Sequence, residues 1–280
     1  MRIDPHTHSL ASDGTDTPAE LMARAAAVGL DVVGLTDHDT VRGWQEAEEA
    51  VAATGVALVR GTEVSCSVDG IAVHVLSLLH DPGDIALAEL LESARTARLR
   101  RAQAMVEGLA ADFPITWESV AAQAGDLSTV GRPHMADALV AAGVFPDRDH
   151  AFASVLHSSG PYYIHLEVPH PRDVVGAIRA AGGVPVMAHP FAARRGKVVS
   201  DAVVEDLAAH GLAALEADHR DHTDADRAHA RALARRLGLL VTGASDYHGR
   251  GKPNQLGENL TAQEVFDEIV AHGTLGVVWP

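Results

Sequence analysis

The stretch His6-Thr7-His8 follows a predicted buried strand near the start of this 280-residue chain, and three similar stretches occur further along: Thr36-Asp37-His38-Asp39, Gly61-Thr62-Glu63 and Ser245-Asp246-Tyr247-His248. The later three follow the apolar runs Val32-Val33-Gly34-Leu35, Val56-Ala57-Leu58-Val59 and Leu239-Leu240-Val241-Thr242. Ligand residues two apart point to one side of an extended strand. Parallel strands that end in a ring of ligands form the metal site at the C-terminal face of a barrel. The pattern therefore predicts a barrel that binds metal and uses it.

Composition limits the class of protein. With 47% hydrophobic and 21% charged residues, the chain can bury the core of one large domain or of a domain with an insertion. No run of about 18 apolar residues occurs, so we expect no membrane-spanning helix. The first motif begins at Asp4, so we expect no signal peptide. The single cysteine, Cys66, excludes an internal disulfide and favours the cytoplasm.

The formal net charge of -16 argues against a partner that is long duplex nucleic acid, since that requires a basic surface. It does not exclude a small nucleotide or a short oligonucleotide, because bound divalent cations dominate the local charge of a site. No obligate protein partner is evident from the sequence.

Alternating strands and helices are predicted in the N-terminal and C-terminal parts of the chain. We expect strands over 2–6, 31–37, 56–64, 71–79, 184–188, 212–216 and 239–241, with helices over 18–28, 40–53 and 172–181. The alternation changes between 84 and 170, where a long helix reaches about 111 and shorter helical pieces follow. The sequence therefore predicts a barrel domain over 1–83 and 171–280, and a mostly helical insertion over 84–170 that covers the barrel mouth and binds substrate.

Together these motifs resemble the PHP family, named for polymerase and histidinol phosphatase. The resemblance is carried by Asp4-Pro5-His6-Thr7-His8-Ser9, Ser12-Asp13-Gly14, Thr36-Asp37-His38-Asp39, Gly61-Thr62-Glu63, Ala188-His189-Pro190 and Ser245-Asp246-Tyr247-His248. Val130-Gly131-Arg132-Pro133-His134, His248-Gly249 and Lys252-Pro253 look most like the branch of nucleoside 3',5'-bisphosphate phosphatases, also described as 5'-to-3' exoribonucleases. The resemblance implies an α/β fold, a distorted TIM-like (β/α)7 barrel. The sequence departs from the family pattern at Pro5, Ala244 and His165.

The resemblance also implies two to three divalent metals, with manganese favoured over iron and zinc. Mixed imidazole and carboxylate ligation suits all three metals. One metal would be held by His6, His8, Glu63 and Asp246; a second by Glu63, His74 and His189; and a third by Asp13, His38 and His248. Asp37 and Asp39 would orient ligand imidazoles, although either fits an ordinary turn.

Hydroxide activated by metal is expected to attack phosphorus in line, with Glu63 and Asp246 as the central catalytic carboxylates. Arg132 is a candidate to grip phosphate, the alternative being an interhelical salt bridge. His134 is a candidate to bind phosphate or to protonate the leaving group, and a capping or core imidazole is the alternative. Further candidates for phosphate contact are Arg194 with its neighbours Arg195 and Lys197, and Lys252 with Arg250, although loop cations are usually only solvated.

The predicted function is metal-dependent phosphoester hydrolysis. The favoured substrate is a nucleoside 3',5'-bisphosphate that loses its 3'-phosphate, as in pAp to AMP, with short 5'-phosphorylated oligoribonucleotides cut from the 5' end. Three alternatives stay open. A histidinol-phosphate phosphatase would share every metal ligand, and a non-catalytic PHP module would usually lack some. An amidohydrolase often bridges its metals with a modified lysine, whereas the only lysines here are Lys197 and Lys252.

Overall fold

The computed structural model describes residues 1–124 and 130–280 and divides them into two compact units. The larger unit contains Met1–Glu92 and Val168–Pro280, and the smaller contains Ser93–Glu167. The insertion predicted over 84–170 includes 125–129, which lie outside the described residues. The role of that insertion as a cover and substrate-binding element stays a prediction.

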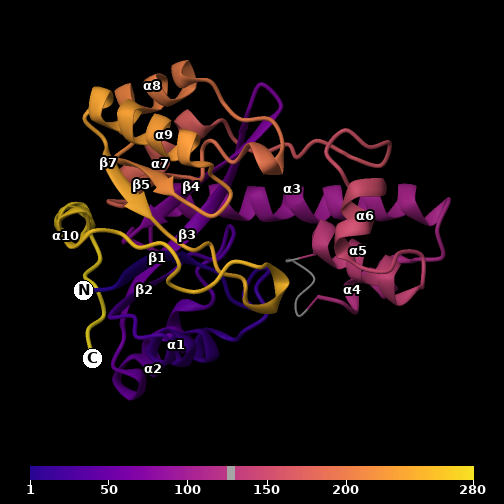
Figure 1. The fold of residues 1–280 in the computed structure, drawn as a ribbon, viewed down its shortest axis with the longest axis horizontal. Helices are drawn as coiled ribbons and strands as arrows, with labels where there is room; N and C mark the ends of the chain where they lie inside the picture. Colours follow the sequence, from indigo (N-terminus) through magenta and orange to yellow (C-terminus); the bar gives the residue numbers. More distant parts are fainter. Residues whose placement is uncertain (125–129) are drawn as a thin grey trace. The chain divides into compact units, whose positions relative to one another are not determined.

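A seven-stranded sheet forms the centre of the larger unit, with its strands hydrogen-bonded in chain order (Figure 1). Parallel pairing joins the first three strands to one another and the last three to one another. Beyond the last strand, Thr7 bridges Tyr247, and the Tyr247 carbonyl accepts a hydrogen bond from His8 N–H at 2.8 Å. The sheet is thus nearly closed, which confirms the predicted distorted barrel. The strands are β1 (Ile3–Thr7), β2 (Val32–Leu35), β3 (Ala57–Val68), β4 (Ile71–Leu78), β5 (Val184–Ala188), β6 (Ala214–Asp218) and β7 (Leu240–Gly243).

One strand runs against the others, and this corrects the prediction that Glu63 ends a parallel strand. β3 continues to Val68 and forms an antiparallel hairpin with β4, so Glu63 lies within the strand and pairs with Leu76. Asp69 and Gly70, with φ of 52° and 75°, make the tight turn of this hairpin. β4 also pairs antiparallel with β5, which brings His74 opposite Ala188.

Most helices begin where the sequence provides a cap. Thr17 and Glu20 form a capping box at the start of α1, with Pro18 as the first helical residue, and Thr223 forms another with Asp226. The helix predicted over 40–53 begins only at Trp44, because the preceding residues form a turn that ends at Gly43. The helices are α1 (Pro18–Ala27), α2 (Trp44–Thr54), α3 (Ile85–Ala110), α4 (Trp117–Ala121), α5 (Arg132–Ala141), α6 (Arg148–Ser154), α7 (Pro171–Ala180), α8 (Asp201–Ala209), α9 (Asp224–Leu237) and α10 (Gln263–His272), with 3-10 turns η2 (Ala193–Arg195) and η3 (Gly249–Gly251).

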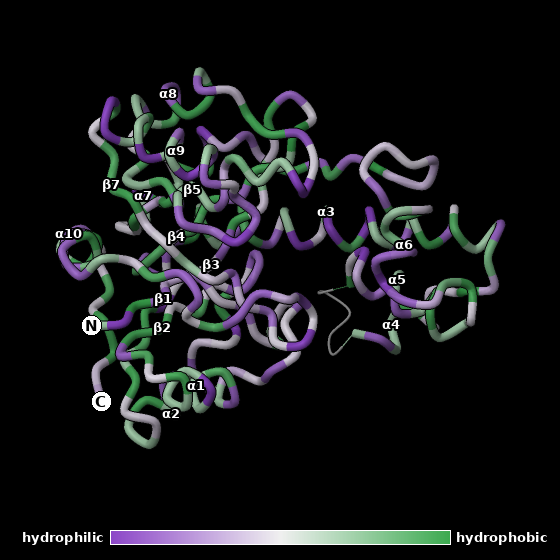
Figure 2. Tube along the Cα trace, viewed as in Figure 1, coloured by the Kyte–Doolittle hydropathy of each residue, from purple (hydrophilic) through white to green (hydrophobic). Residues whose placement is uncertain are grey.

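Each unit has its own apolar core. In the larger unit one cluster, which includes Ile3, Val59 and Val186, draws residues from most of the strands, and further clusters join strands to helices. In the smaller unit Met105, Leu139 and other side chains of α3 to α6 pack together. Figure 2 shows hydrophobic residues along β2 and β7, whereas hydrophilic and hydrophobic residues alternate along α3. No helix in the described part of the chain is long and apolar enough to cross a membrane.

His80 is a buried imidazole outside the predicted metal site. Its burial predicts that the folded protein loses stability in acid. Its Nδ1 lies 2.8 Å from Ser77 Oγ, and its ring lies 5.0 Å from the Trp44 ring. Burial lowers the pKa of His80 to about 4. Between pH 6.5 and 4 the unfolded chain therefore binds more protons than the folded chain, so stability falls as pH falls through this window.

We expect this imidazole to contribute about 2 kcal/mol to the loss of unfolding free energy between pH 7 and pH 5. Urea denaturation of the wild type and of His80→Asn at both pH values measures the contribution. The asparagine keeps a hydrogen-bonding group near Ser77 but does not titrate, and all other titrating groups are common to both proteins. An equal pH dependence in the two proteins would contradict the expectation.

Candidate metal centre

The structure brings the nine predicted ligand residues together at one end of the sheet. They come from six strand regions: His6 and His8 at the end of β1, His38 after β2, Glu63 in β3, His74 in β4, His189 after β5, and Asp246 and His248 after β7, with Asp13 in the loop before α1. Eight of them form three overlapping groups, in each of which the candidate ligand atoms lie within 4.8 Å of one another. The ninth, His189, has its Nε2 3.1 Å from Glu63 Oε1.

Glu63 lies at the centre of this cluster. Its Oε2 is 3.0 Å from His8 Nε2 and 3.2 Å from His38 Nδ1. Its Oε1 is 2.8 Å from His74 Nδ1 and 3.1 Å from His189 Nε2. The two oxygens of one carboxylate thus face two different sets of imidazoles, which is the arrangement of a bridging ligand.

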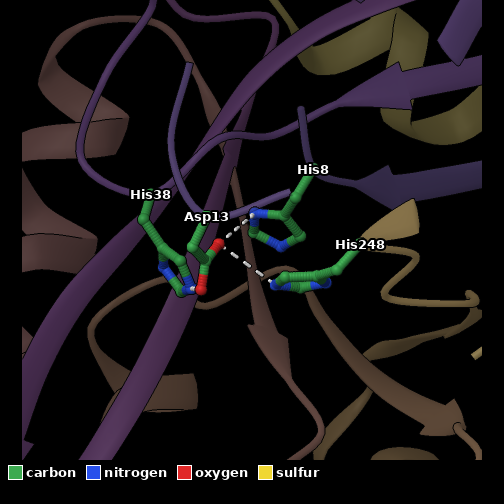
Figure 3. Close-up of side chains that lie close together, drawn as sticks. All are labelled: His8, Asp13, His38 and His248. Carbon is green, nitrogen blue, oxygen red and sulfur yellow. Dashed lines mark ion pairs between the residues drawn. The ribbon is translucent and has the colours of Figure 1, made fainter. Parts of the chain in front are cut away.

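Two further groups lie on either side of His8. Asp246 Oδ1 is 3.2 Å from His8 Nε2 and 3.5 Å from His6 Nε2. On the other side, Asp13 Oδ1 is 3.2 Å from His248 Nε2 and 3.9 Å from His8 Nδ1 (Figure 3). Figure 3 shows His8, His38 and His248 directed toward the Asp13 carboxylate from separate segments. This group is the more open one, since the Asp13 side chain is 20% exposed while His8 is fully buried.

The nitrogen and oxygen atoms of the cluster are better arranged to bind divalent cations than to form hydrogen bonds with one another. His8 Nδ1, Glu63 Oε2 and His248 Nε2 are buried and have no hydrogen-bond partner among the residues that the structure describes. His6 Nε2 and His8 Nε2 face each other at 3.1 Å, although at most one of them can donate to the other. Converging lone pairs of nitrogen and carboxylate oxygen are costly when buried unless a proton or a cation lies between them. Imidazole and carboxylate together suit manganese, iron and zinc.

Charge coupling in the cluster is strong. Burial alone would raise the pKa of Glu63, but the imidazoles of His38, His74 and His6 outweigh it and hold the pKa well below its ordinary value. Burial likewise opposes protonation of His8, yet Asp246 and Glu63 raise its pKa to about 9. The buried carboxylates and imidazoles of the cluster therefore stabilise one another's charged forms. Metal ligation requires the unprotonated imidazole, so metal binding at such a cluster would release protons.

Backbone strain accompanies the cluster. Asp39, His189 and Asp246 have φ of 53°, 31° and 52°, a left-handed region that residues other than glycine seldom adopt. Such conformations cost about 1–3 kcal/mol each and persist where the surroundings impose them. At His189 and Asp246 the strained backbone directs a side chain into the cluster, which supports a functional role for these positions.

Glu216 and His219 of the centre were not predicted from the sequence, and Arg195 was considered only as a phosphate contact. Glu216 Oε2 accepts a hydrogen bond from His6 Nδ1 at 2.8 Å and thereby leaves the Nε2 lone pair of His6 facing the cluster. Burial opposes ionisation of Glu216, but His6 holds its pKa at about 2. Arg195 Nη2 donates to Asp246 Oδ2 at 2.6 Å, and His219 Nε2 lies 3.5 Å from the same oxygen.

Asp37 and Asp39, the residues predicted to support the ligands, form hydrogen bonds with serines. The Asp37 carboxylate accepts hydrogen bonds from Ser9 and Ser12 and fixes the loop before Asp13, and its predicted role in orienting an imidazole stays a prediction. Asp39 accepts two hydrogen bonds from Ser65, next to Glu63 on the β3 side.

Of two loop cations predicted to bind phosphate, Lys252 and Arg194, one lies at the cluster and the other is exposed. Lys252 Nζ is 3.3 Å from Asp246 Oδ2, so it belongs to the centre. Arg194 is exposed on η2, and its neighbour Arg195 makes the contact with the cluster. Adjacent residues of one turn point in different directions, which sequence spacing could not resolve.

Arg132 and His134 belong to the smaller unit. Arg132 Nη1 donates to the Leu156 carbonyl at 3.1 Å, and its guanidinium lies over the Phe152 and Tyr163 rings. His134 Nδ1 accepts a hydrogen bond from Gly131 N–H at 3.1 Å and so caps α5, as in the alternative interpretation of this residue. The roles of Arg132 and His134 toward substrate stay predictions.

Comparisons with known proteins agree with this geometry. Residues 4–111 match the PHP domain family. A 3',5'-nucleoside bisphosphate phosphatase from Chromobacterium violaceum is 36% identical over 252 residues, which cover 89% of this chain and 88% of that protein. A 5'-3' exoribonuclease from Haemophilus influenzae is 32% identical over 271 residues, covering 96% and 97%. A solved structure of a candidate metal-dependent phosphoesterase from Bifidobacterium adolescentis is 43% identical, with a TM-score of 0.93 over 97% of this chain and 96% of that chain.

The centre and the relatives lead to the same class of enzyme. The nine clustered imidazoles and carboxylates can hold divalent metals, and the relatives include a named phosphatase and a named exoribonuclease with similarity along most of their lengths. The chain therefore belongs to the PHP family and is a metal-dependent phosphoester hydrolase.

Proposed function

We propose that this enzyme removes the 3'-phosphate from nucleoside 3',5'-bisphosphates, converting pAp to AMP, and that it degrades short 5'-phosphorylated oligoribonucleotides from the 5' end. The observation that carries the proposal is the Glu63-centred cluster in a chain 36% identical to a named bisphosphate phosphatase. The similarity to a named 5'-3' exoribonuclease supports the second activity. We infer that the enzyme acts on these small substrates in the cytoplasm.

The proposed ligand assignment follows the three groups of donor atoms. His6, His8, Glu63 and Asp246 would hold one metal; Glu63, His74 and His189 a second; and Asp13, His38 and His248 a third. Manganese is favoured, and iron and zinc accept the same donors. Bound divalent cations supply activated water and neutralise charge on the phosphoryl oxygens.

The residues around the ligands have separate roles in this proposal. Glu216 fixes the His6 ring so that Nε2 faces the cluster. Arg195 and Lys252 place two positive charges beside Asp246 Oδ2, where they can attract the phosphate of a substrate. His134 is proposed as the acid that protonates the leaving oxygen. Arg132 is proposed to bind the phosphate that is not hydrolysed. Arg194, which is more exposed, is proposed for the same role.

A comparison of substrates tests the proposal. Adenosine 3',5'-bisphosphate is expected to have a much higher kcat/KM than 3'-AMP, 5'-AMP or histidinol phosphate, because binding of the second phosphate positions the scissile one. A 5'-phosphorylated dinucleotide should also be cut, and long duplex DNA should bind poorly. The measurement is kcat/KM for each compound with one enzyme preparation at fixed manganese. If histidinol phosphate were the best substrate, or if the 5'-phosphate made no difference, the nucleotide assignment would be wrong.

A further inference from the structure

His222 connects the loop after β6 to the loop after β5. Its Nε2 accepts a hydrogen bond from Phe191 N–H at 3.2 Å, and its Nδ1 lies 2.8 Å from the Ala217 carbonyl oxygen. A carbonyl oxygen can only accept, so Nδ1 carries the proton of the ring and Nε2 keeps the lone pair that Phe191 N–H uses. The residue is 4% exposed. Both ring nitrogens therefore serve contacts inside the larger unit.

The Phe191 amide lies two residues after the proposed ligand His189. His189 has a φ of 31°, and its carbonyl accepts a hydrogen bond from Ala192 N–H at 3.2 Å. A strained residue keeps its conformation only where the surrounding chain imposes it. The bond from Phe191 to His222 supplies such a constraint directly after His189. Because Phe191 is buried, its N–H would be left without an acceptor if the imidazole were removed.

The loop that contains His222 is itself held by hydrogen bonds. His222 N–H donates to the His219 carbonyl at 3.2 Å, and Arg227 Nη2 donates to the same oxygen at 2.9 Å. Asp221 N–H donates to His219 Nδ1 at 3.0 Å. The His219 ring is fully buried and lies 5.2 Å from the His189 ring. This loop is therefore a fixed support beside the ligand.

We propose that His222 is a positioning residue of the metal centre. By accepting the Phe191 N–H, it fixes the backbone that directs His189 Nε2 toward Glu63 Oε1, 3.1 Å away. Glu216 orients His6 by contact with the ligand ring, whereas His222 acts on a ligand through the main chain. The inference rests on the ligand assignment in the proposed function.

Two substitutions at His222 separate its bond to Phe191 from its bond to Ala217. Glutamine places its side-chain amide near the position of Nε2, so the amide oxygen can still accept the Phe191 N–H. Asparagine is shorter and places its amide near the position of Nδ1, so it can donate to the Ala217 carbonyl but does not reach Phe191. His229→Ala is the matched control, because the His229 ring lies 4.8 Å from the Phe191 ring while its Nε2 contacts Asp201.

Manganese titration calorimetry of the full-length protein measures the effect without a substrate. His189→Ala identifies the manganese site that depends on His189. At this site His222→Asn should weaken binding by about 10–100-fold, the typical loss when a residue that orients a ligand is removed. His222→Gln should recover most of that loss, and His229→Ala should match the wild type. At fixed manganese, kcat for adenosine 3',5'-bisphosphate should fall in the same order while KM changes little.

Wild-type manganese affinity in His222→Asn, or equal losses in His222→Asn and His222→Gln, would overturn the inference. Failure of the wild type to hydrolyse the bisphosphate would contradict the proposed substrate and leave the manganese result to decide the role of His222. Unchanged manganese binding in His189→Ala would contradict the ligand assignment and the inference together.

Nitrogen NMR of the metal-free wild type with isotope-labelled histidine adds a measurement that stands even if His222→Asn does not fold. The resonances that disappear in His222→Gln belong to His222. They should show a proton on Nδ1 and none on Nε2 at neutral pH, as the bonds to Ala217 and Phe191 require. A proton on Nε2 would exclude the bond to Phe191 and overturn the inference.

Discussion

Glu63→Ala is expected to abolish phosphoesterase activity almost completely. The Glu63 carboxylate approaches His8 and His38 through one oxygen and His74 and His189 through the other, so its removal takes a ligand from two proposed metal positions at once. Several kcal/mol of transition-state stabilisation are commonly attributed to metal ions at phosphoryl centres. At about 1.4 kcal/mol per tenfold change in rate, we expect kcat/KM to fall by roughly a thousandfold or more.

The measurement is kcat/KM for adenosine 3',5'-bisphosphate together with the manganese content per mole of protein. Bound metal should fall in Glu63→Ala, and exhaustively chelated wild type should be as inactive as the variant. Glu48→Ala is the matched control, because Glu48 lies on α2 and forms an ion pair with Arg60. Full activity in Glu63→Ala, or in chelated wild type, would exclude the metal mechanism.

The sequence predicted most of the barrel because its parallel strands have a simple signature. A short apolar run followed at once by a ligand motif occurs at β2 and β7, and these strands formed as expected. The reversed direction of β4 could not be predicted from the same signature, because alternation of buried and exposed residues is identical in parallel and antiparallel strands. The available sequence signal was Asp69-Gly70, because an Asp-Gly pair between two strands is typical of a two-residue hairpin, and the antiparallel register of β3 with β4 shows that hairpin.

The residues of the candidate site were also predicted only in part. The clustered ligand residues lie in motifs that are recognisable locally, such as His6-Thr7-His8. Glu216 was missed because a single carboxylate in the strand Ala214–Asp218 carries no local sign of its partner, His6, which is 210 residues away. A charged residue inside an apolar strand was the one available signal, since burial of such a group requires a partner.

Asp37 and Asp39 both flank His38 and were expected to orient an imidazole, a role that stays a prediction. Ser9, Ser12 and Ser65 supply hydroxyl or amide donors to these carboxylates, and those residues come from other segments. Sequence proximity indicates which groups can interact, but the folded chain offers competing donors that only the three-dimensional structure reveals.

Asp246→Asn is expected to have the second largest effect. Asp246 Oδ1 lies 3.2 Å from His8 Nε2, while Oδ2 accepts hydrogen bonds from Arg195 at 2.6 Å and Lys252 at 3.3 Å. Burial would raise the pKa of Asp246, but Lys252, Arg195 and His248 hold it well below the ordinary value, so the group is charged in the folded protein. An amide keeps the shape but removes the charge, which weakens the proposed metal ligand and leaves two cations without their shared partner.

Asp221→Asn separates these two consequences, because Asp221 Oδ2 is the other acceptor of Arg195, at 2.5 Å, and is not one of the proposed ligands. Loss of a residue that only orients a metal ligand typically costs about 10–100-fold in affinity or activity, so loss of a ligand charge in Asp246→Asn should lower kcat/KM by roughly a hundredfold or more. Manganese titration should show weaker binding in Asp246→Asn and unchanged binding in Asp221→Asn, with activity in the latter reduced by less than about tenfold. If both variants lost activity equally and both retained wild-type manganese affinity, Asp246 would act only by holding Arg195, and the ligand assignment at this position would be wrong.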